Sequence, residues 1–308
     1  MRVRLTLDKE LNDLISLESK KYNLSINGMI NKVISSIDSM KITSYRIKSK
    51  NNIAIDVKIN TKNEYIWMKT LIENKDLSSS EILRGCIAYY FMLSTDKREK
   101  VIYNEQIKKI ESSIDRKISV KIKYRKENEE IDVRKIDAYG IFHTKIESHL
   151  YLIAFCHKRK NVRTFKLSRI ESLEYCKEPI IERKECLDVI ENAKKYFDSF
   201  LSYGQYVKIR FDSAGMELLK KIEVNRPKEI EKKYFYDKFS DDSVIILSKE
   251  ELEDKNIKIF ECSEYQCRVY FYQFLDSIYI LEPKEYREKM IKKFKQAIKV
   301  AEGGFNNE

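Results

Sequence analysis

Two arginines and two tyrosines carry the most specific chemistry in this sequence. Arg163 and Arg169 lie six residues apart, and an even spacing tends to return side chains to one face of a strand. Paired guanidiniums bind phosphate through forked hydrogen bonds and stack on bases. Tyr124 and Tyr151 can add aromatic platforms, each with a hydroxyl. Together these side chains predict a groove for a charged ligand that carries a base.

The histidines add little to this chemistry. His143 is a candidate to line the same groove, although a histidine near a strand end is often an ordinary hydrogen-bonded residue. His157 follows Cys156, but neighbours in a strand point to opposite faces, so the two do not form a thiol pair. No H-E-x-x-H or G-x-S-x-G motif occurs, and no cysteines or histidines have zinc-finger spacing. We expect no catalytic residue, no metal site, no cofactor and no enzyme activity.

A second candidate site lies in the first residues of the chain. Polar and apolar residues alternate strictly over residues 2–7, so a strand there places Arg2, Arg4 and Thr6 on its outer face. Asp8 can then cap an amphipathic helix, and Ser25 can cap another. The outer face of the strand would present two cations to a polyanion.

The same plan recurs about 53 residues further along the chain. A strand over residues 53–59 is followed by a Thr61-x-x-Glu64 capping box and a helix, and a serine run from Ser78 opens a second helix. The outward positions of this strand are Ala54, Asp56 and Lys58. The chain therefore carries a strand, helix, helix repeat.

A short strand followed by two helices resembles the ribbon-helix-helix family of DNA-binding proteins, over Met1 to about Met40. In that family two strands pair into a ribbon that enters a groove of the nucleic acid. The resemblance implies that Arg2, Arg4 and Thr6 read the nucleic acid and that Ser25, Asn27 and Gly28 anchor a phosphate. The second repeat either pairs with the first within one chain or serves a homodimer in which the first repeats pair. The alternative to a ribbon-helix-helix domain is an ordinary amphipathic strand that closes a helical domain and does not contact nucleic acid.

After a charged amphipathic connector, residues 118–176 alternate with period two and predict a small barrel. The expected strands are 118–124, 131–141, 150–156, 162–167 and 170–175.

Three segments of this region resemble the WYL domain, an Sm-like or SH3-like barrel of bacterial regulators. They are residues 122–124, the 150–154 strand and the string 163–170. The chain departs from the family at Leu150, where the name-giving Trp is expected, and at Ala138, where many members have Pro. Residues after the barrel resemble the α+β extension that usually follows a WYL domain.

The fold class is therefore a multidomain α+β protein: a ribbon-helix-helix domain, a WYL barrel and a small α+β sandwich. The expected divisions are 1–45 (ribbon-helix-helix), 46–95 (second repeat), 96–116 (helical connector), 117–178 (barrel), 179–205 (helical linker) and 206–308 (extension).

Composition excludes several function classes. Gly is 7 and Pro 3 of 308 residues, and no glycine-rich phosphate loop exists. The charge of +11 is concentrated in residues 1–50, with +5, and residues 116–177, with +8. Two separate basic blocks favour polyanion contacts. Six scattered cysteines and the lack of an apolar leader or membrane span predict reduced thiols in a soluble cytoplasmic protein.

Two functions remain open. Ribbon-helix-helix, WYL domain and extension together resemble accessory proteins encoded with type VI-D CRISPR systems, which implies binding of single-stranded RNA and modulation of an RNA-guided RNA nuclease. Alternatively, the protein is a dimeric transcription regulator that reads duplex DNA with Arg2, Arg4 and Thr6. Its WYL groove would then sense a nucleotide or another anionic effector.

Overall fold

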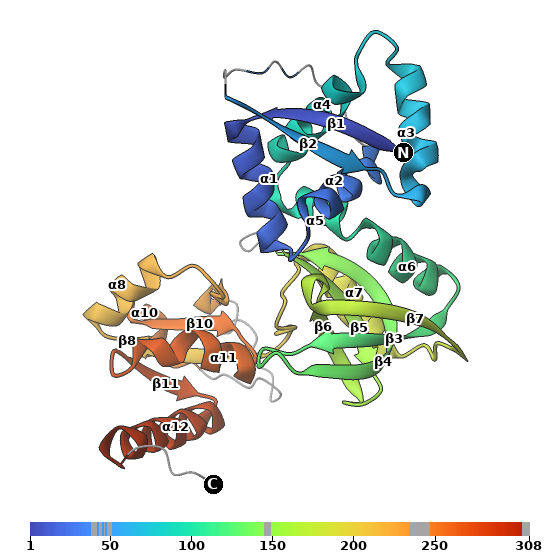
Figure 1. Cartoon of the computed structure of the whole chain (residues 1–308). Helices are drawn as coiled ribbons and strands as arrows, with labels where there is room; N and C mark the ends of the chain where they lie inside the picture. Colours follow the sequence, from blue (N-terminus) through green and yellow to red (C-terminus); the bar gives the residue numbers. More distant parts are fainter. Residues whose placement is uncertain are drawn as a thin grey trace. The chain divides into compact units, whose positions relative to one another are not determined.

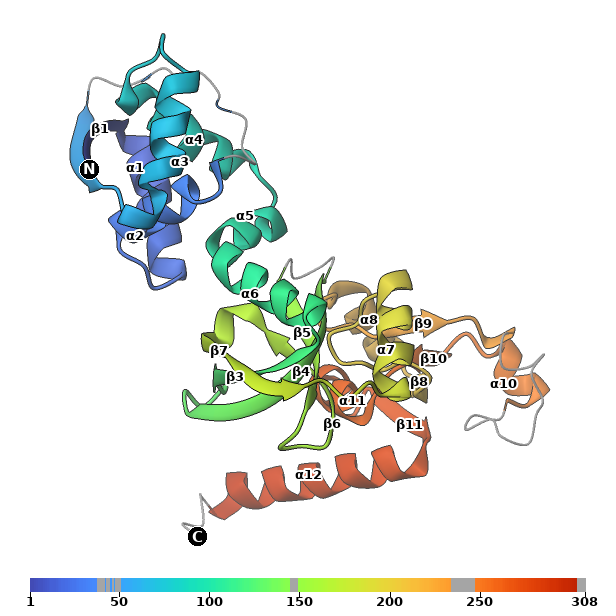
Figure 2. The same ribbon diagram turned by 90° about the vertical axis from the view of Figure 1, so that its right-hand side faces the viewer.

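A computed structural model describes residues 1–37, 42, 45, 47, 51–144, 149–233 and 247–303. The chain is a mixed α and β protein that divides into two compact units (Figures 1 and 2). The first unit holds Met1–His143 and Ser148–Cys186, and the second holds Thr144–Glu147 and Leu187–Glu308. The multidomain α+β class expected from the sequence is confirmed at this level.

Two strand, helix, helix repeats open the first unit. Their elements are β1 (Arg2–Asp8), α1 (Lys9–Lys21) and α2 (Ile26–Ile34), then β2 (Asn52–Lys58), α3 (Thr61–Glu73) and α4 (Ser79–Met92). β1 pairs with β2 in an antiparallel ribbon, with Arg2 opposite Lys58 and Thr6 opposite Ala54. Of the two pairings that the sequence left open, the structure has the one within the chain. We expect a homodimer because a lone ribbon strand seeks a partner strand; β2 of the same chain supplies that partner for β1, and the homodimer stays a prediction.

The two repeats interlock through their second helices. Asn27 Oδ1 accepts a hydrogen bond from the Lys58 N–H at 2.8 Å, so α2 of the first repeat holds the strand of the second. Ser80 Oγ accepts from the Thr6 N–H at 3.2 Å, so α4 of the second repeat holds the strand of the first. Each of these residues lies two positions after the serine that caps its helix. The repeats share one apolar core, in which Leu5, Ile30 and Trp67 are fully buried.

The helix caps follow the sequence in three of four places. Asp8, Ser25 and Ser78 each accept a hydrogen bond from a backbone N–H of the helix they cap. The predicted Thr61 capping box is wrong, because α3 already begins at Thr61 and its N-cap is Asn60. Glu64 is instead 2.8 Å from the amino group of Met1.

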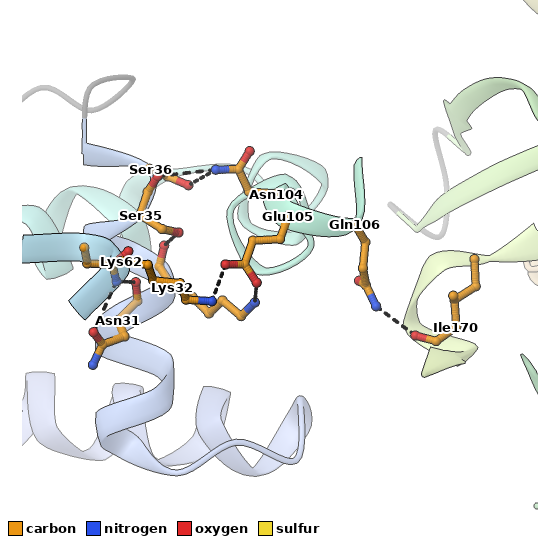
Figure 3. A network of polar contacts seen from close by, with 10 residues as sticks. Asn31, Lys32, Ser35, Ser36, Lys62, Asn104, Glu105, Gln106 and Ile170 are labelled. Carbon is orange, nitrogen blue, oxygen red and sulfur yellow. Dashed lines mark hydrogen bonds and ion pairs between the residues drawn. The ribbon is translucent and has the colours of Figure 1, made fainter. Parts of the chain in front are cut away.

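A connector of two helices, α5 (Thr95–Ile102) and α6 (Asn104–Asp115), joins the repeats to a sheet. Glu105 forms ion pairs with Lys32 of α2 and Lys62 of α3, and Asn104 donates to Ser36 Oγ at 3.1 Å (Figure 3). The neighbouring Gln106 donates to the carbonyl oxygen of Ile170 at 2.8 Å. Consecutive residues of one helix therefore contact both parts of the first unit.

The five predicted strands form one antiparallel sheet. They are β3 (Ile118–Arg125), β4 (Ile131–His143), β5 (Leu150–Cys156), β6 (Asn161–Lys166) and β7 (Ile170–Pro179). Their order is β6-β5-β4-β3-β7, and a 3₁₀ turn, η2 (Leu167–Arg169), links β6 to β7. β6 and β7 lie at opposite edges, so the hydrogen-bonded strands of the described chain do not close a barrel. One face carries the core, with Val120, Ile122 and Leu152 packed against Ile110 of α6.

The second unit is a four-stranded antiparallel sheet with helices. α7 (Lys184–Lys195) crosses from the first unit into it. The sheet has the order β11-β8-β10-β9. Its elements are β8 (Tyr206–Phe211), α8 (Ser213–Lys221), β9 (Lys228–Ile230), α10 (Lys249–Glu253), β10 (Ile257–Glu261), α11 (Glu264–Phe271), η3 (Tyr272–Phe274), β11 (Ile278–Glu282) and α12 (Lys284–Gly303). Aromatic rings fill its core, among them Phe211, Phe260 and Phe271.

None of the helices that the structure describes is long and apolar enough to cross a bilayer.

Candidate nucleic-acid interface

The register of β5 and β6 decides which predicted groove residues share a face. Residues directly opposite each other in an antiparallel pair lie on the same face. Arg163 is opposite Ala154, whose side chain belongs to the core face. Tyr151 is opposite Lys166, and because it lies between the core residues Leu150 and Leu152 it points to the other face. The structure therefore places Tyr151 and Arg163 on opposite faces of the sheet and does not bring them into one groove.

Tyr124 lies on the core face, but its polar and aromatic surfaces are already engaged. Its ring meets Phe165 edge-on at 5.2 Å between centroids. Its hydroxyl accepts a hydrogen bond from the Lys166 N–H at 3.3 Å. The Arg134 guanidinium lies 5.5 Å from the Tyr124 centroid and 5.6 Å from that of Phe165. Tyr124 thus supports a stacked arginine rather than offering an open platform.

Arg134 is the main residue of this face that the sequence reasoning missed. Its Nε lies 3.2 Å from Asp132 Oδ2, and Lys158 Nζ lies 2.7 Å from Asp132 Oδ1. Hydrogen bonds from Lys158 and Arg134 hold the pKa of Asp132 below its usual range, against the effect of burial. Arg134 lies two residues before the buried Ile136 in β4, so alternation along this strand could have placed it on the core face.

Arg169 and His143 lie at the ends of the sheet. Arg169 is in η2, immediately before Ile170, which is opposite Tyr124. Because Arg169 is in a 3₁₀ turn, strand alternation does not relate it to Arg163. Its guanidinium is 3.4 Å from Glu127 Oε1. His143 is exposed at the last position of β4, opposite Leu150.

The other two histidines are held by buried carboxylates. His149 Nδ1 lies 2.8 Å from Glu99, and His157 Nε2 lies 2.9 Å from Asp137. Both carboxylates are almost fully buried. These histidines are structural contacts.

The β5–β6 hairpin groups three accessible cations. Arg159, Lys160 and Arg163 are exposed, and within the described part of the chain none of them forms an ion pair. Guanidinium and ammonium groups without intramolecular carboxylates are available to phosphate. This hairpin is the strongest candidate contact on the sheet.

The ribbon presents the predicted residues outward. Arg2 and Arg4 are exposed and Thr6 is half-buried, while Val3, Leu5 and Leu7 between them are buried. No described carboxylate lies within ion-pair distance of Arg2 or Arg4. The orientation predicted from the alternation is present.

The start of α2 is less open than expected. Ser25 Oγ accepts from the Gly28 N–H at 3.0 Å, and the Asn27 side chain is bound to β2. The oxygens of both side chains therefore hold local structure together, which leaves the Ser25 hydroxyl proton, the Asn27 Nδ2 and free backbone N–H groups as donors to a phosphate. α4 differs from α2 because Glu81 hydrogen-bonds the Ser78 N–H and places a carboxylate at the helix start.

Among the described residues no group of three histidine, cysteine or acidic side chains is arranged to hold a metal ion.

The sheet belongs to a recognised domain family. Residues 105–175 match the family model of the WYL domain. The chain therefore contains a WYL domain, formed by α6 and the five-stranded sheet. A search of curated protein sequences found no match.

One solved structure shares the fold over nearly the whole chain. A crystal structure of a CRISPR Cas-related protein superposes with a TM-score of 0.60 at 14% identity, over 99% of this chain and 95% of that one. Proteasome accessory factor B/C of Arthrobacter aurescens aligns at 13% identity with a TM-score of 0.29, over 97% of this chain and 50% of that one. The chain spans half the length of the second protein. At these identities the first likeness is one of fold.

Proposed function

We propose that this chain is a non-catalytic regulator that binds nucleic acid, with single-stranded RNA as its main target. The β5–β6 hairpin carries the proposal, because Arg159, Lys160 and Arg163 are exposed and have no ion-pair partner among the described residues. Cations of this kind bind phosphates and release counterions from the strand. The stacked Arg134 lies on the same face of the sheet as Arg163, but its side chain is largely buried and paired with Asp132.

The finer fold is part of this proposal. The interlocked repeats would form a ribbon-helix-helix domain within one chain, supported by the β1–β2 ribbon. The WYL sheet would be a curved Sm-like barrel, supported by its strand order. The second unit would be the extension that follows WYL domains.

We further propose that the protein is an accessory factor that modulates a type VI-D CRISPR RNA-guided RNA nuclease. Support comes from the WYL domain together with the fold likeness of the whole chain to a CRISPR Cas-related protein. An RNA target inside the cell agrees with six free cysteines, five of them buried. The protein would then act in the cytoplasm, next to the nuclease.

A duplex-DNA regulator is the second candidate function. The ribbon favours a duplex-DNA regulator, since Arg2, Arg4 and Thr6 line its outer face, as in proteins that insert a ribbon into a groove. In this case the WYL groove would sense an anionic effector, and a homodimer would read two half-sites.

Competition binding with a labelled RNA oligonucleotide and a labelled promoter fragment tests the proposal. If the hairpin binds RNA, Arg163→Ala should weaken RNA binding by about 1 to 3 kcal/mol and change duplex binding little. Lys123→Ala is the matched control, because Lys123 is an exposed cation opposite Val133 on the other face of the sheet. If the Arg163→Ala variant binds RNA as wild type does, or loses no more affinity than the Lys123→Ala variant, the hairpin is not the RNA site.

A further inference from the structure

The ribbon's charge is gathered on one half. Arg2, Arg4 and Lys58 are exposed on its outer face, and Arg2 stands directly opposite Lys58. The other half carries Thr6 opposite Ala54 and then Asp8 opposite Asn52, and Asp8 is buried, so this half exposes no cation in this row. Asp56, opposite Arg4, is too far for an ion pair. Within the described chain, the three cations therefore have no carboxylate partner.

A hollow of about 610 Å³ adjoins the same half of the ribbon. Lys58 lines it, with Asn60, Thr61 and Lys62 from the start of α3. Glu64, the acidic residue that lines it, is paired with the amino group of Met1, and Lys62 is paired with Glu105 outside the lining. The volume falls within the range of ligand sites, and the lining offers ammonium, amide and hydroxyl groups.

A ribbon whose exposed cations lie at one end differs from a ribbon made by two identical strands. In a symmetric ribbon every cation has a symmetry-related copy at the opposite end, so both ends can contact phosphates. A duplex groove needs this arrangement, because a backbone flanks the ribbon on each side. Here the second half offers Thr6, Ala54 and Asn52 beside the buried Asp8, which give a second backbone no cationic contact.

We propose that the half-ribbon of Arg2, Arg4 and Lys58, with the adjoining hollow, is a site for one phosphate backbone of a single-stranded nucleic acid. This inference rests on the proposed binding of single-stranded RNA and adds a second contact to that of the β5–β6 hairpin. The strand crosses one end of the ribbon and does not run along it. The ribbon is then not a groove reader, although it has the strand pairing of one.

The test measures how affinity depends on salt, with the full chain and labelled oligouridine RNA. Removing one cation that binds a phosphate should make the slope of log affinity against log salt shallower by about 0.7. We expect this for Arg2→Ala, Arg4→Ala and Lys58→Ala singly, and a change of about 2 for the triple variant. Lys9→Ala removes the same charge from exposed α1 and should leave the slope unchanged.

Ala54→Lys is the decisive variant, because it adds a cation to the neutral half of the ribbon. If the strand crosses only the Arg2 end, Ala54→Lys leaves the slope for RNA as in wild type. A steeper slope, by about 0.7, would show that the strand runs along the ribbon and would overturn the inference. Thermal melting of each variant reports whether it is folded.

Two further outcomes separate this inference from the proposed function. If the ribbon variants bind RNA as wild type does while Arg163→Ala weakens RNA binding, the half-ribbon is not a binding site and the hairpin proposal stands. If wild type binds mixed-sequence duplex DNA more tightly than RNA, and Arg2→Ala and Arg4→Ala reduce that binding, the ribbon is a groove reader. A wild-type protein that binds neither probe contradicts both proposals.

Discussion

Asp137 is the most heavily bonded side chain of the WYL sheet. It is fully buried in β4 and accepts hydrogen bonds from Ser119, His157 and Arg183, at 2.6, 2.9 and 2.8 Å. Arg183 also stacks on Phe155, with its guanidinium 3.7 Å from the ring centroid. Because Arg183 precedes α7, one carboxylate fixes the start of the segment that leaves the sheet.

The pH dependence of folding should report this carboxylate. Burial alone would raise the pKa of Asp137, but the hydrogen bonds from His157, Ser119 and Arg183 outweigh it and lower the pKa. A lowered folded-state pKa means that the stabilisation is complete above the unfolded value of about 3.9 and is lost as pH falls through the folded value. Denaturant unfolding at a series of pH values should show this loss below about pH 4.

The substitution Asp137→Asn should remove this pH-dependent stabilisation. Replacing the carboxylate leaves the half-buried Arg183 guanidinium uncompensated, so we expect a loss of about 3 to 5 kcal/mol at neutral pH and a flatter acid limb. Glu217→Gln is the control, because Glu217 and its partner Lys220 on α8 are both largely exposed and such pairs contribute little to stability. An Asp137→Asn protein as stable as wild type, with the same acid limb, would contradict the assignment.

At the scale of elements, Asn31 of α2 joins the two repeats most closely. Its Nδ2 donates to the Lys58 carbonyl at 2.9 Å, and its Oδ1 accepts from the Asn60 N–H at 2.8 Å. Asn63 donates to both the Asn31 backbone carbonyl and its Oδ1. The end of β2 and the start of α3 thus depend on one amide from the other repeat.

Asn31→Ala should therefore destabilise the ribbon. It removes the hydrogen bonds of the Asn60 N–H and the Lys58 carbonyl, which are partly buried, and each such bond contributes about 0.5 to 1.5 kcal/mol. Hydrogen exchange of β1 and β2 should become faster, while the WYL sheet keeps its protection. Asn192→Ala is the control, since the Asn192 amide only bonds the Asp188 carbonyl on exposed α7. Unchanged exchange in β2 would show that the amide is dispensable.

The sequence predicted elements better than it predicted the contacts between them. Strict alternation is local, so the ribbon strands and the five sheet strands could be assigned, and so could the outward position of Arg2 and Arg4. Which strand pairs with β1 is a long-range choice, and no local pattern encodes it. The shared groove of Tyr151 and Arg163 failed for the same reason, because their faces depend on the register between β5 and β6. The Thr61 capping box failed because helix starts are uncertain by a residue.

At the scale of the first unit, the connector helices hold the repeats and the WYL sheet together. Glu99 of α5 is buried and accepts a hydrogen bond from the Leu150 N–H at 2.8 Å at the start of β5. Hydrogen bonds from Lys62 and the charge of Lys32 keep the pKa of Glu105 below its usual value, although burial opposes this. Glu105 is therefore ionised at neutral pH, and α6 binds α2 and α3 through charge.

Breaking the sheet side of this connector should uncouple the two parts during unfolding. In the double variant Glu99→Ala with Gln106→Ala, the Leu150 N–H and the Ile170 carbonyl are left without their connector partners, at about 1 to 3 kcal/mol for each buried group. Hydrogen exchange at increasing denaturant should then show the repeats and the sheet opening at different concentrations, whereas we expect them to open together in wild type. Glu111→Ala is the matched control, because Glu111 is exposed on α6 and forms no ion pair among the described residues. If the double variant still loses protection in both parts at one denaturant concentration, the coupling lies in the apolar packing of α5 and α6 and not in these hydrogen bonds.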